Sequence, residues 1–360
     1  MRLNLKLILF ISLITASCSE NESNQSTDNQ DQSNFISSVD ISSFPKIELF
    51  DPIFKNESGD IISFLNFLKL KGVNTIRIRL WVNPSNQHSS FEEVKSFSDS
   101  LKSLGFNIYL ALHFSDTWAD PGHQIIPEIW ENNSFTDLKG IVYEYTQMIV
   151  QEINPDIIQI GNEINNGFLH PIGNIHSNPN QFRDLISECI RAVRENSLNQ
   201  TKIMIHYAGH QDSVNFFDFF EDLDYDIIGI SYYPIWHGKS LTELEQNLIQ
   251  LRSYNNKDIM IAETAYPFTL GWNDWTNNIV GLEEHLILPQ YPASPLGQME
   301  FIADLKTMIS NLDGGIGFSY WGAELIAWDG PESNEGSPWE NQALFDFNNQ
   351  ALPVLDVFQD

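Results

Sequence analysis

The sequence predicts a single (β/α)8 barrel, the α/β fold also known as a TIM barrel. Short apolar segments alternate with stretches of helical apolar spacing along most of the chain, which is typical of parallel strands joined by helices. Several apolar segments end on a polar or aromatic side chain, as strands do at the mouth of a barrel. The length of 360 residues suits one such domain, since these barrels run to about 250 residues or more.

Eight apolar or β-branched segments provide the candidate strands of this barrel. They occupy residues 39–42, 74–81, 106–114, 156–163, 201–207, 226–234, 258–264 and 315–322. Most of the intervals between them contain helix-like stretches, for example 60–72, 137–153 and 298–312. The main alternative is a doubly wound open sheet, which usually has fewer strands. No glycine-rich phosphate loop follows the first candidate strand, so the closed barrel is the favoured prediction.

Residues 1–17 predict a signal peptide of the lipoprotein type. A basic start precedes an apolar run at 7–14, which is shorter than the roughly 20 residues that span a bilayer. Small residues then lead into Cys18, which resembles a bacterial lipobox except that Thr15 stands where an aliphatic residue is usual. We therefore expect an exported lipoprotein of the outer membrane or cell surface, lipidated at Cys18. An ordinary secretory signal is the alternative.

Residues 18–38 are polar and acidic with few apolar side chains, and they predict a disordered tether. The barrel domain then occupies residues 39–360. Within that domain Cys189 is the remaining cysteine, so no internal disulfide or cysteine zinc site is expected. Cys189 lies in a helix-like stretch, where a buried small apolar role is expected.

The charge balance limits the partners of the chain. There are 48 acidic residues against 19 basic ones, which gives a formal net charge of -29. Nucleic acids and anionic membrane surfaces attract basic patches, so neither is expected to bind the domain. We expect membrane association only through the N-terminal lipid, and we expect a monomer.

Two glutamates end candidate strands and form the predicted catalytic pair. Glu163 closes the fourth segment, directly after Asn162, and Glu263 closes the seventh. Burying an unpaired carboxylate is costly, so such strand ends favour an active site over a core. In a barrel the carboxyl ends of the strands meet at one face. Two carboxylates about 5–5.5 Å apart hydrolyse glycosides, one protonating the leaving oxygen and one attacking the anomeric carbon.

An arginine is expected beside this pair. Arg77 and Arg79 lie on the same face of the second candidate strand. Because a guanidinium stays protonated, one of them beside Glu263 would hold that carboxylate ionised. We expect at least one of the two arginines to pair with a structural carboxylate instead.

Other strand ends supply candidate supporting groups. Asn162 is placed to hydrogen-bond the sugar hydroxyl next to the reacting carbon. Tyr232 or Tyr233 could donate to the attacking carboxylate, and Trp321 could form the floor under the sugar ring. A lone tyrosine or tryptophan more often belongs to the core, so these roles depend on the barrel.

Six segments together resemble one family of glycosidases. They are WVNP (81–84), HFSDTWADPGHQIIPEIW (113–130), IQIGNEINNGFLHP (158–171), GISYYPIW (229–236), AETAYP (262–267) and WENQALFDFNNQALPVL (339–355). This set resembles glycoside hydrolase family 53, the endo-β-1,4-galactanases, over almost the whole stretch after the tether.

The resemblance implies a retaining clan A barrel that hydrolyses the β-1,4-galactan of type I arabinogalactan and pectin. It implies that Glu163 is the acid/base, that Glu263 is the nucleophile and that Arg77 contacts the nucleophile. It also places three residues in the substrate cleft: His113, Trp118 and Asp120. No cofactor is needed for this chemistry.

The chain departs from the family pattern in three places. Residues 111–114 read Ala-Leu-His-Phe where Asp-Phe-His-Tyr is usual, and His170 stands where many members have tryptophan. Some members bind calcium in the loop after the seventh strand, but residues 271–281 contain only Asp274 as an acidic ligand. Calcium prefers about six to eight oxygens, so no family-type site is expected. Trp272 in this loop either contacts a sugar or packs the loop down.

Two other functions stay open at this point. A different clan A β-glycanase, such as a mannanase or cellulase, would use the same carboxylates. A catalytically silent glycan-binding lipoprotein would be marked by loss of one glutamate, and both are present here.

Overall fold

The computed structural model describes residues 35–359, and all eight predicted strands are present in it. The predicted signal peptide, Cys18 and most of the predicted tether lie outside the described residues. The strands are β1 (Ile36–Asp40), β2 (Thr75–Leu80), β3 (Asn107–Leu112), β4 (Ile157–Ile160), β5 (Lys202–Ala208), β6 (Ile227–Ser231), β7 (Asp258–Thr264) and β8 (Gly315–Trp321).

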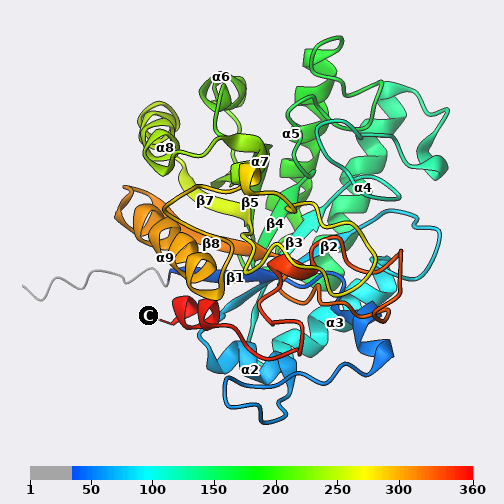
Figure 1. The fold of residues 1–360 in the computed structure, drawn as a ribbon. Coiled ribbons are helices and arrows are strands. Elements are labelled where there is room, and N and C mark those ends of the chain that lie inside the picture. The colour runs from blue at the N-terminus through cyan, green and yellow to red at the C-terminus, as the bar shows by residue number, and fades with distance from the viewer. Residues whose placement is uncertain (1–34, 360) are drawn as a thin grey trace, which may run out of the picture. The chain divides into compact units, whose positions relative to one another are not determined.

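The strands form a closed parallel barrel in sequence order, which confirms the predicted fold (Figure 1). Closure is made by β8 against β1, where Ile36 pairs with Gly317 and Asp40 pairs with Trp321. The open-sheet alternative is therefore wrong. Because all eight strands run the same way, their carboxyl ends lie together at one mouth of the barrel.

The longer helices surround the barrel on its outside, whereas the short helices α1 and α7 contribute residues to the pocket at its mouth (Figure 1). The helices are α1 (Phe44–Ile47), α2 (Phe64–Leu70), α3 (Phe91–Ser103), α4 (Phe135–Ile153), α5 (Pro179–Asn196), α6 (Ser213–Asp218), α7 (Pro234–His237), α8 (Leu241–Asn255) and α9 (Pro295–Asn311). Short 3-10 segments are η1 (Glu48–Phe50), η2 (Glu128–Trp130), η3 (Glu283–His285), η4 (Glu340–Gln342) and η5 (Pro353–Phe358).

Serine caps set the starts of four of the longer helices. The hydroxyls of Ser90, Ser134, Ser240 and Ser294 each accept a hydrogen bond from a backbone N–H in the first turn. At α4 the side chain of Asp137 returns a bond to the backbone of the cap, which completes a capping box. No helix in residues 35–359 is both long and apolar enough to cross a membrane.

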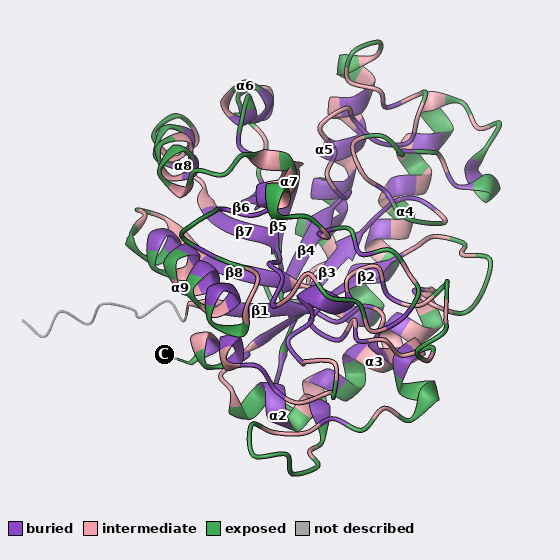
Figure 2. Ribbon diagram, viewed as in Figure 1, coloured by how far each residue is buried: buried purple, intermediate pink, exposed green. Residues whose placement is uncertain are grey.

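The core lies between the strands and the inward faces of the helices (Figure 2). Strands of a parallel barrel are buried on both faces, which explains why they read as continuous apolar runs. The barrel interior is also filled. A methyl group added at Gly229 would lie 2.4 Å from the sulfur of Met204, so a glycine makes room for that side chain. Cys189 on α5 is buried, as predicted.

The first strand begins earlier than predicted. The sequence placed its start at Val39, whereas β1 starts at Ile36. Ser37 and Ser38 are buried and pair with β8, but small polar residues give no apolar signal. A strand can therefore extend through serines when its neighbours bury them.

The backbone after β4 turns sharply and carries Glu163 into the barrel mouth. Gly161, Glu163 and Gly167 all have positive φ, of 73°, 48° and 91°. A methyl group added at Gly167 would lie 2.0 Å from the carbonyl oxygen of Gly173. Positive φ is rare for a residue such as glutamate, and strained positions of this kind cluster at functional sites.

We predict that Gly167→Ala lowers the free energy of unfolding by about 2 kcal/mol or more, because both the backbone angle and the close carbonyl oppose a methyl group. Urea denaturation measures this change. Gly140→Ala is the matched control, since Gly140 lies in α4 with open space around it and should gain up to about 1 kcal/mol. Equal effects of the two substitutions would contradict the account of this turn.

Candidate active site

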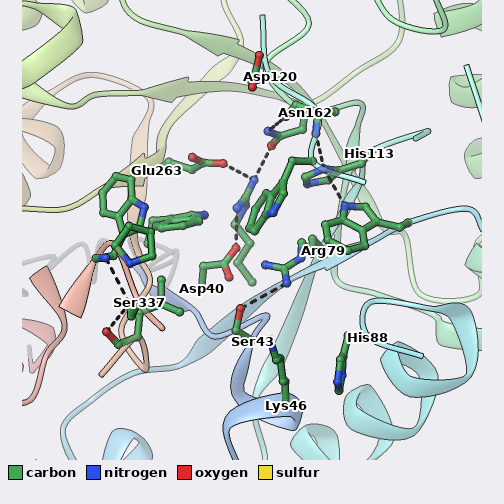
Figure 3. Close-up of a pocket in the computed structure, with 18 of the residues that line it drawn as sticks. Asp40, Ser43, Lys46, Arg79, His88, His113, Asp120, Asn162, Glu263 and Ser337 are labelled. Carbon is green, nitrogen blue, oxygen red and sulfur yellow. Dashed lines mark hydrogen bonds and ion pairs between the residues drawn. The ribbon is translucent and has the colours of Figure 1, made fainter. Parts of the chain in front are cut away.

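A pocket of about 550 Å³ opens at the carboxyl ends of the strands. Both predicted catalytic residues, Glu163 and Glu263, line it. Figure 3 shows side chains converging on this space from different strands of the barrel. A concave site with a few converging polar groups at this face is where barrel enzymes do their chemistry.

Glu263 lies at the end of β7 and is only 6% exposed. One of its carboxylate oxygens lies 2.7 Å from the guanidinium of Arg77. Its other oxygen accepts a hydrogen bond of 3.0 Å from the hydroxyl of Tyr233. Burial raises the pKa of Glu263, while the Arg77 charge and the Tyr233 hydroxyl act in the opposite direction.

Arg77 is the buried cation at the centre of the site. Its guanidinium also forms an ion pair of 2.6 Å with Asp40 at the end of β1. A third contact, of 2.8 Å, runs to the side-chain oxygen of Asn162. One fixed positive charge therefore faces two carboxylates, which stabilises their ionised forms.

Glu163 has a different environment, although it lies close to Glu263. One of its oxygens accepts a hydrogen bond of 2.6 Å from Ser231, and it has no ion pair with a cation in residues 35–359. Burial, followed by the negative charge of Glu263, raises the pKa of Glu163 to about 8. Of the two carboxyls, Glu163 is therefore the one that keeps a proton near neutral pH.

His206 supports Ser231 from the next strand. Its Nδ1 accepts from the backbone N–H of Glu163 at 3.3 Å, so Nε2 carries the proton. That Nε2 lies 2.8 Å from the hydroxyl oxygen of Ser231 and donates to it. Burial lowers the pKa of His206 well below its usual range, which keeps the ring neutral. His206 therefore donates to Ser231, and Ser231 in turn donates to Glu163.

Donor atoms of Glu163, His206 and Glu263 lie within 4.8 Å of one another. Three such groups could hold a cation, but each already has a partner. Arg77 and Tyr233 contact the two oxygens of Glu263, and Ser231 contacts one oxygen of Glu163 and Nε2 of His206. The short separation of the two carboxyls is instead suited to a reaction at a single carbon between them.

The other predicted cleft residues that line the pocket are His113, Trp118, Asp120, Asn162 and Trp321. The ring of Trp118 lies 6.0 Å from that of Trp321. Nδ1 of the buried His113 accepts from the backbone N–H of Ala119 at 3.3 Å, which fixes the loop that carries Trp118. Two tryptophan rings therefore line the same pocket as the two carboxyls.

Two predicted site residues do not reach the pocket. The hydroxyl of Tyr232 donates to the backbone of Gly238, because successive residues at a strand end point to opposite sides and Tyr233 faces the site. Trp272 is 51% exposed in the loop after β7 and is not among the residues that line the pocket.

The loop after β7 carries Asp274 as its one acidic residue between positions 271 and 281. The carboxylate of Asp274 accepts from the backbone of Thr276 at 2.6 Å and of Ser337 at 3.3 Å, which ties this loop to the one after β8. Oε2 of Glu340 and Oδ1 of Asn278 are buried oxygens without a hydrogen bond. Calcium takes roughly six to eight oxygens, and the expectation that no family-type calcium site forms here stays a prediction.

Sequence reasoning missed several residues of the site. Asp40 ends β1, and the same rule that selected the glutamates at strand ends could have found it. Ser231 stands two residues before Tyr233, on the same side of the chain. Trp339 comes from the loop after β8 and lies 4.6 Å from Trp321. Trp339 begins the family-like segment 339–355, but the sequence does not show that its ring contacts Trp321.

Comparison with known proteins identifies the family. The sequence model of Glycosyl hydrolase family 53 matches residues 36–358. An arabinogalactan endo-β-1,4-galactanase from Cellvibrio japonicus is 32% identical over 353 residues, which cover 91% of this chain and 92% of that protein.

Two solved structures share both sequence and fold with the chain. The family 53 catalytic domain from Ignisphaera aggregans is 37% identical with a TM-score of 0.83, covering 91% of this chain and 96% of that one. A chain from the structures of two fungal β-1,4-galactanases is 30% identical with a TM-score of 0.77, and the match covers 89% of this chain and 98% of that one. The protein therefore belongs to glycosyl hydrolase family 53 and is a glycoside hydrolase.

Proposed function

We propose that this chain is a retaining endo-β-1,4-galactanase acting on the β-1,4-galactan of type I arabinogalactan and pectin. The relatives that carry this activity in their names support the substrate. The observation that carries the mechanism is the pair of unlike carboxyls, Glu163 and Glu263, with oxygens within 4.8 Å of each other. Such a short separation supports double displacement, since an inverting enzyme keeps its carboxyls about 6.5–9.5 Å apart to admit a water.

In the first step, Glu263 attacks the anomeric carbon while Glu163 gives its proton to the leaving oxygen. The galactosyl group becomes an ester on Glu263, and the rest of the polysaccharide leaves as an alcohol. Arg77 and Tyr233 favour the ionised nucleophile, and their contacts must weaken as its charge moves into the ester. Glu163 is left ionised and ready for the second step.

In the second step, Glu163 takes a proton from water, and the oxygen of that water attacks the same carbon. The ester bond to Glu263 breaks, so the product keeps the β configuration and Glu163 regains its proton. The hydrogen bond from Ser231 stabilises Glu163 in the ionised form that exists between the two steps.

We also propose that the protein is a monomeric surface lipoprotein, anchored through Cys18. The residues before Cys18 support this proposal, as the sequence around it resembles a lipobox. Incorporation of radiolabelled palmitate into the intact protein, absent in Cys18→Ser, tests the anchor. Labelling that persists in the variant would contradict it, and light scattering would test the monomer.

We predict that Glu163→Gln and Glu263→Gln each reduce kcat on linear β-1,4-galactan at least about 10³-fold, because each removes a group that reacts. Both variants should still bind galacto-oligosaccharides. Product analysis over time measures the loss, and NMR of the first product should detect the β-anomer.

Near-normal turnover in either variant would disprove the assignment of the two glutamates. An α-anomer as first product would disprove the retaining mechanism. Mannan and cellulose serve as substrate controls, and faster cleavage of either would move the activity to another β-glycanase class.

We predict that Ser231→Ala moves the alkaline limb of the kcat/KM profile upward by about 0.5–1 pH unit. The Ser231 hydroxyl donates to the ionised form of Glu163 and so lowers its pKa, which means that removing the donor raises the pKa. Activity needs protonated Glu163, so it should persist to higher pH.

Ser319→Ala is the control for this profile, since the buried Ser319 hydroxyl has no hydrogen-bond partner in residues 35–359. Its pH profile should stay unchanged. An alkaline limb that stays in place or moves downward in Ser231→Ala would contradict the role given to this hydroxyl.

A further inference from the structure

We propose that the end of the cleft beside β1 and β2 binds an anionic sugar, with Lys46 and Arg79 recognising the carboxylate of a uronic acid. This inference rests on the proposed function, because it concerns the same cleft and extends its substrate from neutral galactan to galactan that carries a uronic acid. Figure 3 shows Lys46, Ser43 and Arg79 gathered on one side of the pocket, away from Asn162 and Glu263.

Lys46 is the exception among the lysines of residues 35–359. Every other lysine there forms an ion pair with a carboxylate or donates to a backbone carbonyl. The ammonium of Lys46 has neither kind of partner, although the chain contains 48 acidic residues. A cation without a carboxylate partner in so acidic a protein is available for a ligand.

The position of Lys46 is fixed by an aromatic contact. Its ammonium lies 4.2 Å from the ring centroid of Trp328, and both residues line the pocket. The ring of Phe50 packs edge-on against Trp328 at 4.8 Å. The charge is therefore held at the pocket wall by an interaction that leaves its N–H donors unused.

Arg79 provides a second cation that has no ion pair within residues 35–359. Its guanidinium lies 4.1 Å from the ring of Trp118 and donates to the hydroxyls of Ser89 and Ser43, at 2.9 and 3.3 Å. Arg77, in contrast, already faces two carboxylates. Two cations of this kind favour a ligand with a negative charge over one with hydroxyls alone.

The acidic groups near Lys46 and Arg79 have other partners or are exposed to solvent. Asp40 is paired with Arg77, and Glu93 lies 2.8 Å from His88. Glu324 is buried, and one of its oxygens accepts a hydrogen bond of 2.8 Å from the backbone N–H of Ser43. Burial raises the pKa of Glu324 to about 8, so it is largely neutral at neutral pH. Glu335 lines the pocket and is exposed, where solvent screens its charge.

The role proposed for Glu163 as general acid sets the direction in which the polysaccharide lies in the cleft. Glu163 on β4 protonates the leaving oxygen in the proposed mechanism, so the leaving part of the polysaccharide extends toward β4. Strand β8 lies opposite β4 in the closed order of strands, and β1 is the neighbour of β8. Lys46 therefore contacts the part of the polysaccharide that stays bound to Glu263. The uronic acid whose carboxylate it recognises lies toward the non-reducing end of the substrate.

Two probes that differ by one group test this inference. One is the linear β-1,4-linked galactopentasaccharide, and the other is the same compound with C6 of its non-reducing terminal galactose oxidised to a carboxylate. Calorimetry measures the Kd of both for Glu163→Gln, which binds without turnover. We expect the carboxylated probe to bind at least about fivefold more tightly at low salt, with the preference shrinking at high salt.

Lys46→Met in the Glu163→Gln background should reduce this preference to about onefold, and Lys46→Arg should keep most of it. Lys202→Met is the matched control. It removes one positive charge at the start of β5, at the opposite end of the barrel from the pocket, and should keep the full preference. Equal affinity for both probes, or a preference that persists in Lys46→Met, would overturn the inference.

Turnover of the neutral pentasaccharide by the unmodified protein tests the proposed function separately. Cleavage of that probe together with equal affinities would reject the anionic subsite alone. Preference for the carboxylated probe without cleavage of either would reject the galactanase activity alone.

Discussion

The ion pairs of Arg77 with Glu263 and Asp40 are the interaction on which the rest of the site depends. A guanidinium that is only 1% exposed is costly to bury unless carboxylates and hydrogen-bond acceptors surround it. The barrel meets this need by bringing Asp40, Asn162 and Glu263 from three strands to one point. Removing Arg77 would leave Glu263 buried without a counter-charge.

The same arrangement separates the behaviour of two neighbouring carboxyls. Glu263 faces Arg77 and the hydroxyl of Tyr233, whereas Glu163 faces a single hydroxyl and the negative charge of Glu263 itself. Unlike environments then favour a proton on Glu163 and a charge on Glu263, which is what a general acid and a nucleophile require. The positive φ of Glu163 contributes to this arrangement, because it turns the side chain away from the strand and toward the pocket.

Sequence patterns predicted the eight strands because strands buried on both faces are continuous apolar runs, and they failed where Ser37 interrupts the run. Selecting polar residues at the ends of apolar segments identified both glutamates. Applied to every segment, the same criterion would also have identified Asp40. It selected Tyr232 as well as Tyr233 because a register shift near the end of β6 hides which residue faces inward. Lys46 could not be predicted, because its surroundings come from loops after different strands.

The central claim is that the proton resides on Glu163 and the charge on Glu263. Titration of both side-chain carboxyls by ¹³C NMR tests it most directly, with the two signals assigned from the single glutamine variants. The account predicts that Glu163 titrates at the higher pH and that Glu263 is ionised first. A titration in which Glu263 holds its proton to higher pH than Glu163 would contradict the account and reverse the two roles.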